Sequence, residues 1–95
     1  MERQLEIFIT NLDKKYIKNK VTGEVTNWCM VTYLIPKEEN IKSKGCAQLS
    51  CYCKENAFTD LEKYMYKWSK AVVKDTVEDN RIKLKIKSVD NVVVS

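Results

Sequence analysis

Apolar residues recur at every second position in several segments of this sequence, and this spacing constrains the fold more than any other feature. The alternation begins with Leu5, Ile7 and Ile9. Successive side chains of a strand point to opposite faces of a sheet, so period two predicts strands with one buried face. The same pattern covers Lys15–Val21, Val25–Ile35, Cys46–Lys54 and Arg81–Lys87, and a valine run, Val92–Val94, suggests a short last strand.

Turn signals separate these segments. Thr22-Gly23 predicts a hairpin turn, because glycine takes positive φ without steric cost. Asn11–Asp13 predicts a turn or a bulge, and Asp90-Asn91 a further turn. Pro36 ends the apolar strand before it, and a polar connection follows from Lys37 to Gly45.

One helix is expected, from Thr59 to Lys74. Thr59 and Glu62 have the spacing of a capping box. An apolar stripe follows at spacings of three and four residues: Phe58, Leu61, Tyr64, Met65, Trp68 and Val72. A polar loop, Asp75–Asn80, would then end the helix.

These elements predict an α+β fold that is mostly β. The expected order is β-β-β-β-α-β-β, with one amphipathic helix on a small curved antiparallel sheet or an OB-like barrel. The 95 residues form one domain, residues 1–95. The first residues lack the apolar core of a signal peptide, so we expect a cytoplasmic protein.

The net charge of +4 is unevenly distributed. Two acid-free stretches hold eight of the seventeen basic residues, while the other nine accompany all thirteen acids. Such segregation favours a face that binds a polyanion, although a solvated lysine-rich surface would have the same composition. The two stretches contain Lys14, Lys15, Lys18 and Lys20, and Arg81, Lys83, Lys85 and Lys87.

Both stretches place cations on one face of a predicted strand. Residues i and i+2 lie about 6.6–6.8 Å apart there, close to the spacing of phosphates in an extended single strand. Aromatic rings among the cations would stack on bases. Tyr16 lies within the first stretch, Tyr52 lies beside Lys54 on the polar face of its strand, and Trp28 is a third candidate. Each ring also fits a purely structural role as an amphipathic cover of the sheet.

The sequence does not indicate a protein that recognises double-stranded DNA, since the polar face of the predicted helix mixes acids with lysines. We also expect no enzyme, because histidine is absent and no nucleophile or phosphate-binding motif occurs. The carboxylate pairs Glu38-Glu39 and Glu78-Asp79 fall in polar connections, where they serve solubility. The four cysteines lack a C-x-x-C pair, so we expect reduced core thiols and neither a metal nor another cofactor: Cys29, Cys46, Cys51 and Cys53.

The segment Lys14–Glu24, the apolar strand through Val31-Thr32-Tyr33 and the basic strand from Arg81 to Lys87 together resemble the small single-stranded-DNA-binding proteins of phages and mobile elements, including the gene V type. The resemblance implies an OB-like protein that coats single strands during DNA replication, often as a dimer. It also implies binding by Tyr16, Lys18, Lys20 and Tyr52. The predicted helix departs from the gene V pattern.

Two functions follow as hypotheses. The first is non-catalytic binding of single-stranded nucleic acid, DNA rather than RNA. The predicted binding residues are Lys14, Tyr16, Lys18, Lys20, Trp28, Tyr52, Lys54, Arg81, Lys83, Lys85 and Lys87. The alternative is a small protein-binding module, such as a phage-encoded inhibitor of a host enzyme. We expect the last strand, Val92–Val94, to pair within the barrel or across the axis of a homodimer, because an open valine edge would aggregate.

Overall fold

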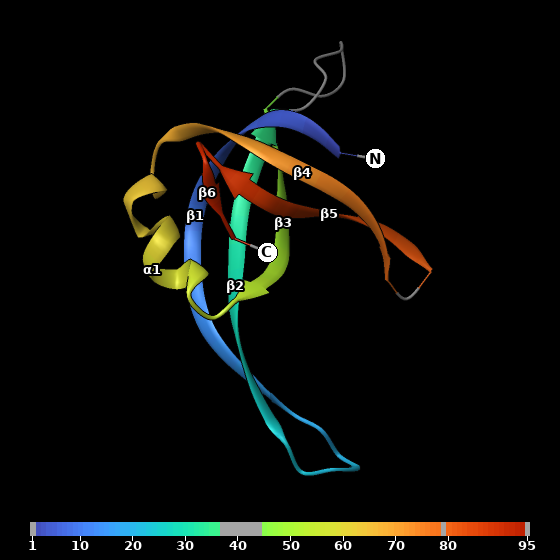
Figure 1. The fold of residues 1–95 in the computed structure, drawn as a ribbon. Helices are drawn as coiled ribbons and strands as arrows, with labels where there is room; N and C mark the ends of the chain where they lie inside the picture. The colour runs from blue at the N-terminus through green and yellow to red at the C-terminus, as the bar shows by residue number, and fades with distance from the viewer. Residues whose placement is uncertain (1, 37–44, 79, 95) are drawn as a thin grey trace.

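A computed structural model of the chain describes residues 2–36, 45–78 and 80–94, and one curved antiparallel sheet dominates it (Figure 1). Its strands, in sequence order, are β1 (Glu2–Lys18), β2 (Val25–Pro36), β3 (Cys46–Lys54), β4 (Trp68–Glu78), β5 (Arg81–Val89) and β6 (Val92–Val93). In the sheet they lie in the order β3-β2-β1-β4-β5-β6. The predicted α+β, mostly β fold with a small curved sheet is confirmed. The predicted order β-β-β-β-α-β-β is wrong, because three strands precede the helix and three follow it among the described residues. The sheet does not close into a barrel, so the alternative prediction of an OB-like barrel is wrong.

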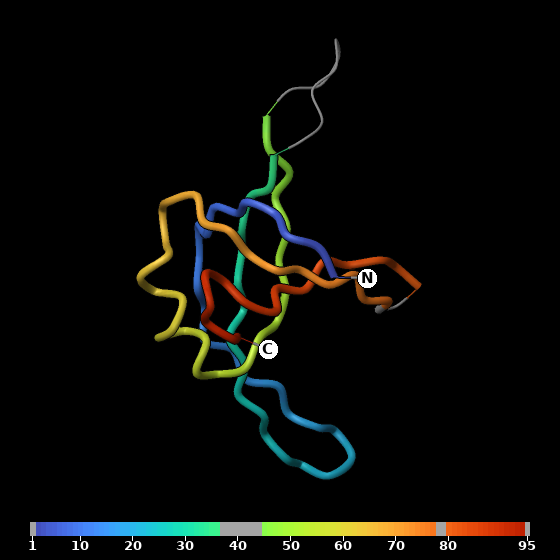
Figure 2. Tube along the Cα trace, turned by 45° about the horizontal axis from the view of Figure 1, so that its top comes forward, coloured from blue at the N-terminus to red at the C-terminus, as the bar shows by residue number. Residues whose placement is uncertain are grey.

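The sheet is nevertheless strongly rolled. In the part of the chain that the structure describes, β3 pairs with another strand only along its β2 edge, and Arg81–Ile86 of β5 only along its β4 edge. These two strands nevertheless approach one another. The tube view also shows β3 and β5 on adjacent sides of the rolled sheet (Figure 2). We call the gap between them the seam.

β1 is a single strand where the sequence predicted two. Ile9 pairs with Tyr33 and Asn11 with Thr32, so Thr10 is an extra residue in the ladder. The predicted turn or bulge near Asn11 is therefore a bulge, and the Thr10 hydroxyl donates to the Thr32 carbonyl at 3.2 Å. A bulge reverses which alternate side chains face inward.

The predicted helix over Thr59–Lys74 is wrong in length. The helix α1 spans only Ala57–Leu61, a 3-10 turn follows at Glu62–Tyr64, and β4 then begins at Trp68. Thr59 lies inside α1, whose N-cap is Asn56, so the capping box does not form. Ser69, Ala71 and Val73 are buried at period two, and β4 pairs with the first half of β1. The β-branched residues of this segment suit a strand, and the pairing edge of β1 outweighs the helical spacing.

The predicted turn at Asp90-Asn91 is confirmed. Asp90 and Asn91 both have positive φ, as a type I′ hairpin requires, and β6 pairs with β5 within the chain. The predicted polar loop at Asp75–Asn80 is wrong, because β4 extends to Glu78. The predicted connection Lys37–Gly45, apart from Gly45, and its Glu38-Glu39 pair lie outside the described residues.

The core lies on the inner face of the rolled sheet. β1 contributes Ile7 and Ile9, β2 contributes the largest buried side chain, Tyr33, and α1 packs against β1 with Ala57 and Leu61. The other fully buried side chains are Cys29, Val31, Cys53, Ala71, Val73, Ile86, Val89 and Val94. The outer face of the sheet is therefore the one that can carry a site.

Candidate nucleic-acid interface

The ends of β1 and β2 extend beyond the core as a two-stranded hairpin, which we call the arm (Lys14–Asn27; Figures 1 and 2). Every side chain in the arm is exposed. Its turn is built by Asn19, whose side-chain oxygen accepts hydrogen bonds from the backbone N–H groups of Val21 at 2.9 Å and Thr22 at 3.3 Å. Gly23 follows with φ +75°, which confirms the turn predicted there.

The register divides the arm into two different faces. Tyr16 pairs with Asn27 and Lys18 with Val25, so Lys14, Tyr16 and Lys18 share one face, which continues the inner face of the sheet. The Lys14 ammonium lies 4.8 Å from the centre of the Phe58 ring of α1. The opposite face carries Ile17, and it continues the outer face of the sheet.

On that outer face the structure brings together two of the three predicted aromatic residues. Trp28 is the partner of Lys54, and the next same-face pair along the ladder is Met30 with Tyr52. Directly paired side chains on antiparallel strands share a face, so Trp28, Tyr52 and Lys54 form one cluster. Trp28 is half-buried, whereas Tyr52 is 44 % exposed.

A groove of about 420 Å³ runs along this cluster and across the seam, and we call it the aromatic groove. Lys85 of β5 forms its far side. A smaller hollow of about 60 Å³ continues it along the seam, sharing Tyr52 and Lys85 and adding Lys83. The residues lining the aromatic groove are Ile17, Asn19, Glu24, Thr26, Trp28, Tyr52 and Lys85.

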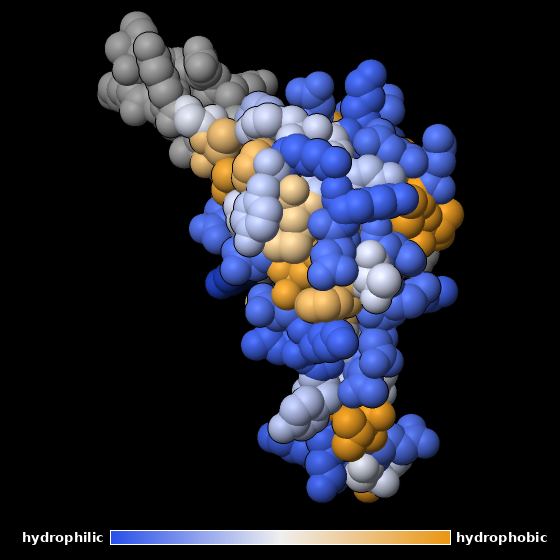
Figure 3. All heavy atoms as spheres, turned by 90° about the vertical axis from the view of Figure 1, so that its left-hand side faces the viewer, coloured by the Kyte–Doolittle hydropathy of each residue, from blue (hydrophilic) through white to orange (hydrophobic). Residues whose placement is uncertain are grey.

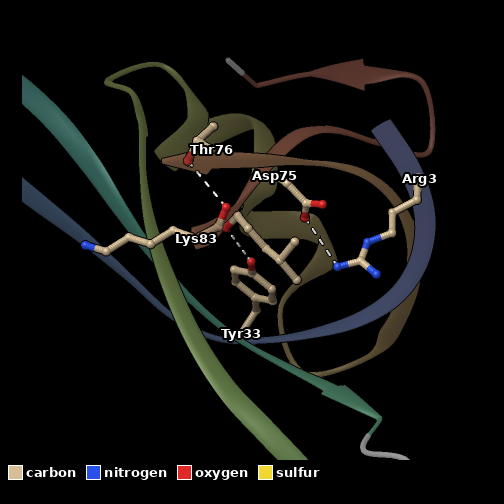
Figure 4. A network of polar contacts seen from close by, with 6 residues as sticks. Arg3, Tyr33, Asp75, Thr76 and Lys83 are labelled. Atoms are coloured by element: carbon tan, nitrogen blue, oxygen red, sulfur yellow. Dashed lines mark hydrogen bonds and ion pairs between the residues drawn. The ribbon is translucent and has the colours of Figure 1, made fainter. Parts of the chain in front are cut away.

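A hydrogen bond joins the two sides of the seam, and a second one lies within the β4–β5 ladder (Figure 4). The Tyr33 hydroxyl of β2 donates to the Leu84 carbonyl of β5 at 2.8 Å. Thr76 donates to the Lys83 carbonyl at 3.3 Å, and Figure 4 shows the Lys83 side chain directed away from these contacts. Burial raises the pKa of Tyr33 well above its usual range, with the neighbouring thiols adding to the effect.

The basic strand supplies its cations in two ways. Lys83 pairs with Thr76 and Lys85 with Lys74, so these lysines share the outer face. Lys87 sits at a bulge, between residues that pair with Val72 and Val73, and it forms an ion pair with Glu2. The hydrogen bond from Lys87 lowers the pKa of the Glu2 carboxyl. Lys87 therefore leaves the regular spacing that the sequence predicted for four cations.

The predicted binding residues thus fall into two groups. The groove side holds Trp28, Tyr52, Lys54, Lys83 and Lys85. Tyr16 lies outside it, in a shallow depression on the flank of the arm that Trp28 also borders. The other members are placed away from the groove: Lys14 and Lys18 share the Tyr16 face, Lys20 is in the turn, Arg81 begins β5, and Lys87 pairs with Glu2.

Sequence reasoning missed Ile17 and Met30, which line the groove and the adjoining hollow. Their signal was present, because period two across the hairpin puts Ile17 and Trp28 on a common face once the register is known. The register itself depends on where the chain turns, at Asn19–Glu24.

The cysteines are mostly core residues, as expected. Cys29 and Cys53 are buried and Cys51 is half-buried, but Cys46 is exposed, so the core prediction is wrong for it. The Sγ atoms of Cys51 and Cys53 lie 3.9 Å apart. Their hydrogen bond and burial raise the pKa of Cys53, and burial raises that of Cys29.

Within the described ranges 2–36, 45–78 and 80–94, three or more histidine, cysteine or acidic side chains nowhere gather as a metal site. In the same ranges, helices fall short of the length and apolarity needed to cross a membrane. Comparisons of the chain with protein-family models, with curated proteins and with solved structures found no match.

Proposed function

We propose that the protein binds single-stranded nucleic acid, DNA in preference to RNA, along the aromatic groove and without catalysis. The observation that carries the proposal is the convergence of Trp28, Tyr52 and Lys85 on one groove. Two rings offer stacking surfaces for successive bases, and the lysines across the seam offer partners for phosphates.

The spacing of the cations supports the same function. Lys83 and Lys85 are two residues apart on one face of β5, which separates them by about 6.6–6.8 Å. A single strand lying along the seam would meet one cation per phosphate on one side and a ring on the other. Glu24, at the arm end of the groove, disfavours phosphates there and would direct the backbone toward β5.

The position of the groove adds support by analogy. OB folds bind oligonucleotides on the face of strands 2 and 3, between the loops that join strands 1 to 2 and strands 4 to 5. Trp28 and Tyr52 lie on β2 and β3, beside the arm that joins β1 to β2. The likeness is one of position in the fold, and the proposed binding rests on the chemistry of Trp28, Tyr52 and Lys85.

Fluorescence anisotropy with oligo-dT and oligo-U tests the proposal. We expect Tyr52→Ala to weaken binding by about 1–3 kcal/mol, roughly 5- to 150-fold, through loss of one stacked base. Tyr16→Ala is the matched control, because it also removes a tyrosine ring but from the face of the arm that lies away from the groove. For this variant we expect affinity close to wild type. Equal losses in both variants, or no binding at low salt, would refute the groove as the site.

The salt dependence provides an independent measurement. For single strands, the slope of log K against log salt is about −0.7 for each phosphate contact. We expect Lys85→Gln to make the slope shallower by about 0.7, and Lys18→Gln, whose side chain lies on the opposite face of the arm from the groove, to leave it unchanged. A salt-independent affinity would contradict phosphate binding altogether.

A protein-binding module is a second candidate, and the exposed apolar residues of the arm favour it. Ile17 is 49 % exposed, Val25 55 % and Val21 93 %. Pull-down from a nuclease-treated lysate separates the two functions, since a stoichiometric protein partner that survives nuclease favours this one.

A further inference from the structure

A second surface with exposed aromatic rings and lysines lies away from the aromatic groove, between α1 and the start of β4. Lysines and aromatic residues alternate densely from Lys63 to Lys70, and no acid occurs from Lys63 to Lys74. The sequence assigned this segment to the apolar stripe of a helix. Its actual conformation exposes much of it to solvent.

The backbone turns outward at Tyr66. Tyr66 has φ 60°, which is rare for a bulky residue, and its N–H donates to the Ile9 carbonyl at 2.9 Å. The ring is 70 % exposed. Trp68, two residues on, is 46 % exposed and meets the Phe8 ring edge-on, with the ring centres 5.5 Å apart. Tyr66 is thus held in a costly conformation that presents its ring to solvent.

Lysines flank these two rings in the sequence. Lys63, Lys67 and Lys70 are all exposed, and the Lys63 ammonium lies 5.2 Å from the centre of the Tyr64 ring. Figure 3 views the molecule from this side and shows strongly hydrophilic residues around less polar ones. Glu6 is the cross-strand partner of Lys70 and offsets its charge, so Lys63 and Lys67 are the main cations.

One member of this surface, Trp68, lies on the face of the sheet that carries the aromatic groove. Trp68 pairs with Phe8, and Phe8 pairs with Leu34 of β2. Leu34 and Trp28 are six residues apart on one face of the same strand, which is about 20 Å, or roughly three nucleotides of extended strand. The side chains between them on β2 are Thr32 and Met30, and their partners on β1 and β3 are Asn11, Asp13, Ser50 and Tyr52.

We propose that Tyr66 and Trp68, with Lys63 and Lys67, form a second contact for the same single strand that the aromatic groove binds. The inference rests on the proposed function. A nucleic acid fits better than another anionic partner because exposed rings accompany lysines at both surfaces, and Trp68 lies on the same face of the sheet as Trp28. Short oligomers then occupy the groove alone, and longer ones also reach Trp68.

The chain contains two tryptophans, one at each surface, so each surface has its own fluorescent reporter. Trp28→Phe leaves Trp68 as the only tryptophan, and Trp68→Phe leaves Trp28. Leu34 and Trp68 are two further strand spacings apart, so a strand anchored at Trp28 needs more than about four nucleotides to reach Trp68. Each variant is therefore titrated with dT oligomers of about 4 and about 15 nucleotides, within the range of site sizes of single OB folds. We expect both oligomers to quench Trp28 and only the longer one to quench Trp68.

The outcomes separate this inference from the proposed function. Quenching of Trp28 without any response of Trp68 to the longer oligomer overturns the second contact and leaves the groove standing. A response of Trp68 without one of Trp28 refutes the groove and, with it, a second contact for the strand that the groove binds. If Trp68 responds to vesicles containing phosphatidylserine and to neither oligomer, a membrane surface replaces the nucleic acid and the inference fails.

Affinity gives a second readout that does not depend on fluorescence. Tyr66→Asn removes the ring and introduces a residue type that tolerates the positive φ at this position. We expect it to weaken binding of the longer oligomer roughly 5- to 150-fold and to leave the shorter one unchanged. Tyr16→Asn is the matched control, and equal affinity of wild type and Tyr66→Asn for the longer oligomer would overturn the inference.

Discussion

Two stretches of the same β1–β2 ladder differ sharply in what their side chains do. In the body of the sheet, inward residues such as Ile9, Val31 and Tyr33 are fully buried. In the arm, which the same two strands form a few residues further on, every side chain is exposed. The hydrogen-bonded ladder is continuous, so backbone pairing alone does not decide whether a strand contributes to the core.

The difference teaches where this chain has room for function. A large apolar side chain buried in the body stabilises the fold by roughly 1.5–3 kcal/mol, because folding removes its apolar surface from water. The apolar side chains of the arm gain little of this, so they are free to serve recognition. Valine and tyrosine occur in both regions, which allows the comparison to be tested with matched substitutions.

The largest expected effect is the difference in the free energy of unfolding between a variant of a core valine and a variant of an arm valine on the same strand. Val31→Ala removes buried methyl groups and leaves a cavity, so we expect a loss of about 2–3 kcal/mol in the free energy of unfolding. Val25→Ala makes the same change at a 55 % exposed site, and there we expect a loss within about 0.5 kcal/mol. Thermal unfolding measures both, with a shift of roughly 4–8 °C per kcal/mol for a chain of this size. Similar shifts would mean that the arm packs against something in solution.

The sequence foretold the arm better than the segment after β3. The hairpin turn, the alternation and the basic character of the arm all follow from local rules, because the arm makes few contacts beyond itself. Residues 59–74 follow a rule that is not local. Their spacing fits a helix, but the free edge of β1 at Glu2–Phe8 requires a strand, and β4 supplies it.

The candidate site was partly predictable for the same reason. Period two placed Tyr52 and Lys54 on the polar face of their strand. The separation of Tyr16 from Tyr52 was not predictable, because it depends on one bulge residue, Thr10, that reverses the alternation along β1. The approach of Lys85 to Trp28 depends on how far the sheet rolls, and no local pattern encodes that.

An intermediate effect is expected from two tyrosines. Tyr33→Phe removes the hydrogen bond to the Leu84 carbonyl across the seam, so we expect a loss of about 1 kcal/mol. Tyr16→Phe removes a hydroxyl from a ring that is 75 % exposed, and we expect no measurable change in the free energy of unfolding. Chemical denaturation at neutral pH gives both values. A Tyr16→Phe loss as large as that of Tyr33→Phe would show that the arm is structurally coupled to the body.

Tyr33 also predicts a pH dependence. The pKa of Tyr33 is raised in the folded protein, so the unfolded chain loses this proton first as the pH rises past about 10. Tyr33 therefore contributes stability that is complete below about pH 10 and is lost above it. We expect the free energy of unfolding to fall less steeply above pH 10 in Tyr33→Phe than in wild type. Cys29 and Cys53, whose pKa values are also raised, begin the decline from about pH 9 in both proteins.

The smallest global effect is expected at the arm's turn. Gly23 has φ +75° and open space around its α-carbon, so Gly23→Ala strains the backbone without creating a clash. We expect the arm to open more readily by about 1 kcal/mol, which raises amide exchange at Ile17 roughly fivefold. The slow exchange of Val31 should stay at its wild-type rate, because the body does not need the arm closed. If exchange at Val31 rises as much as exchange at Ile17, the arm and the body unfold as one unit. The arm's apolar side chains would then have to be counted as part of what holds the sheet together.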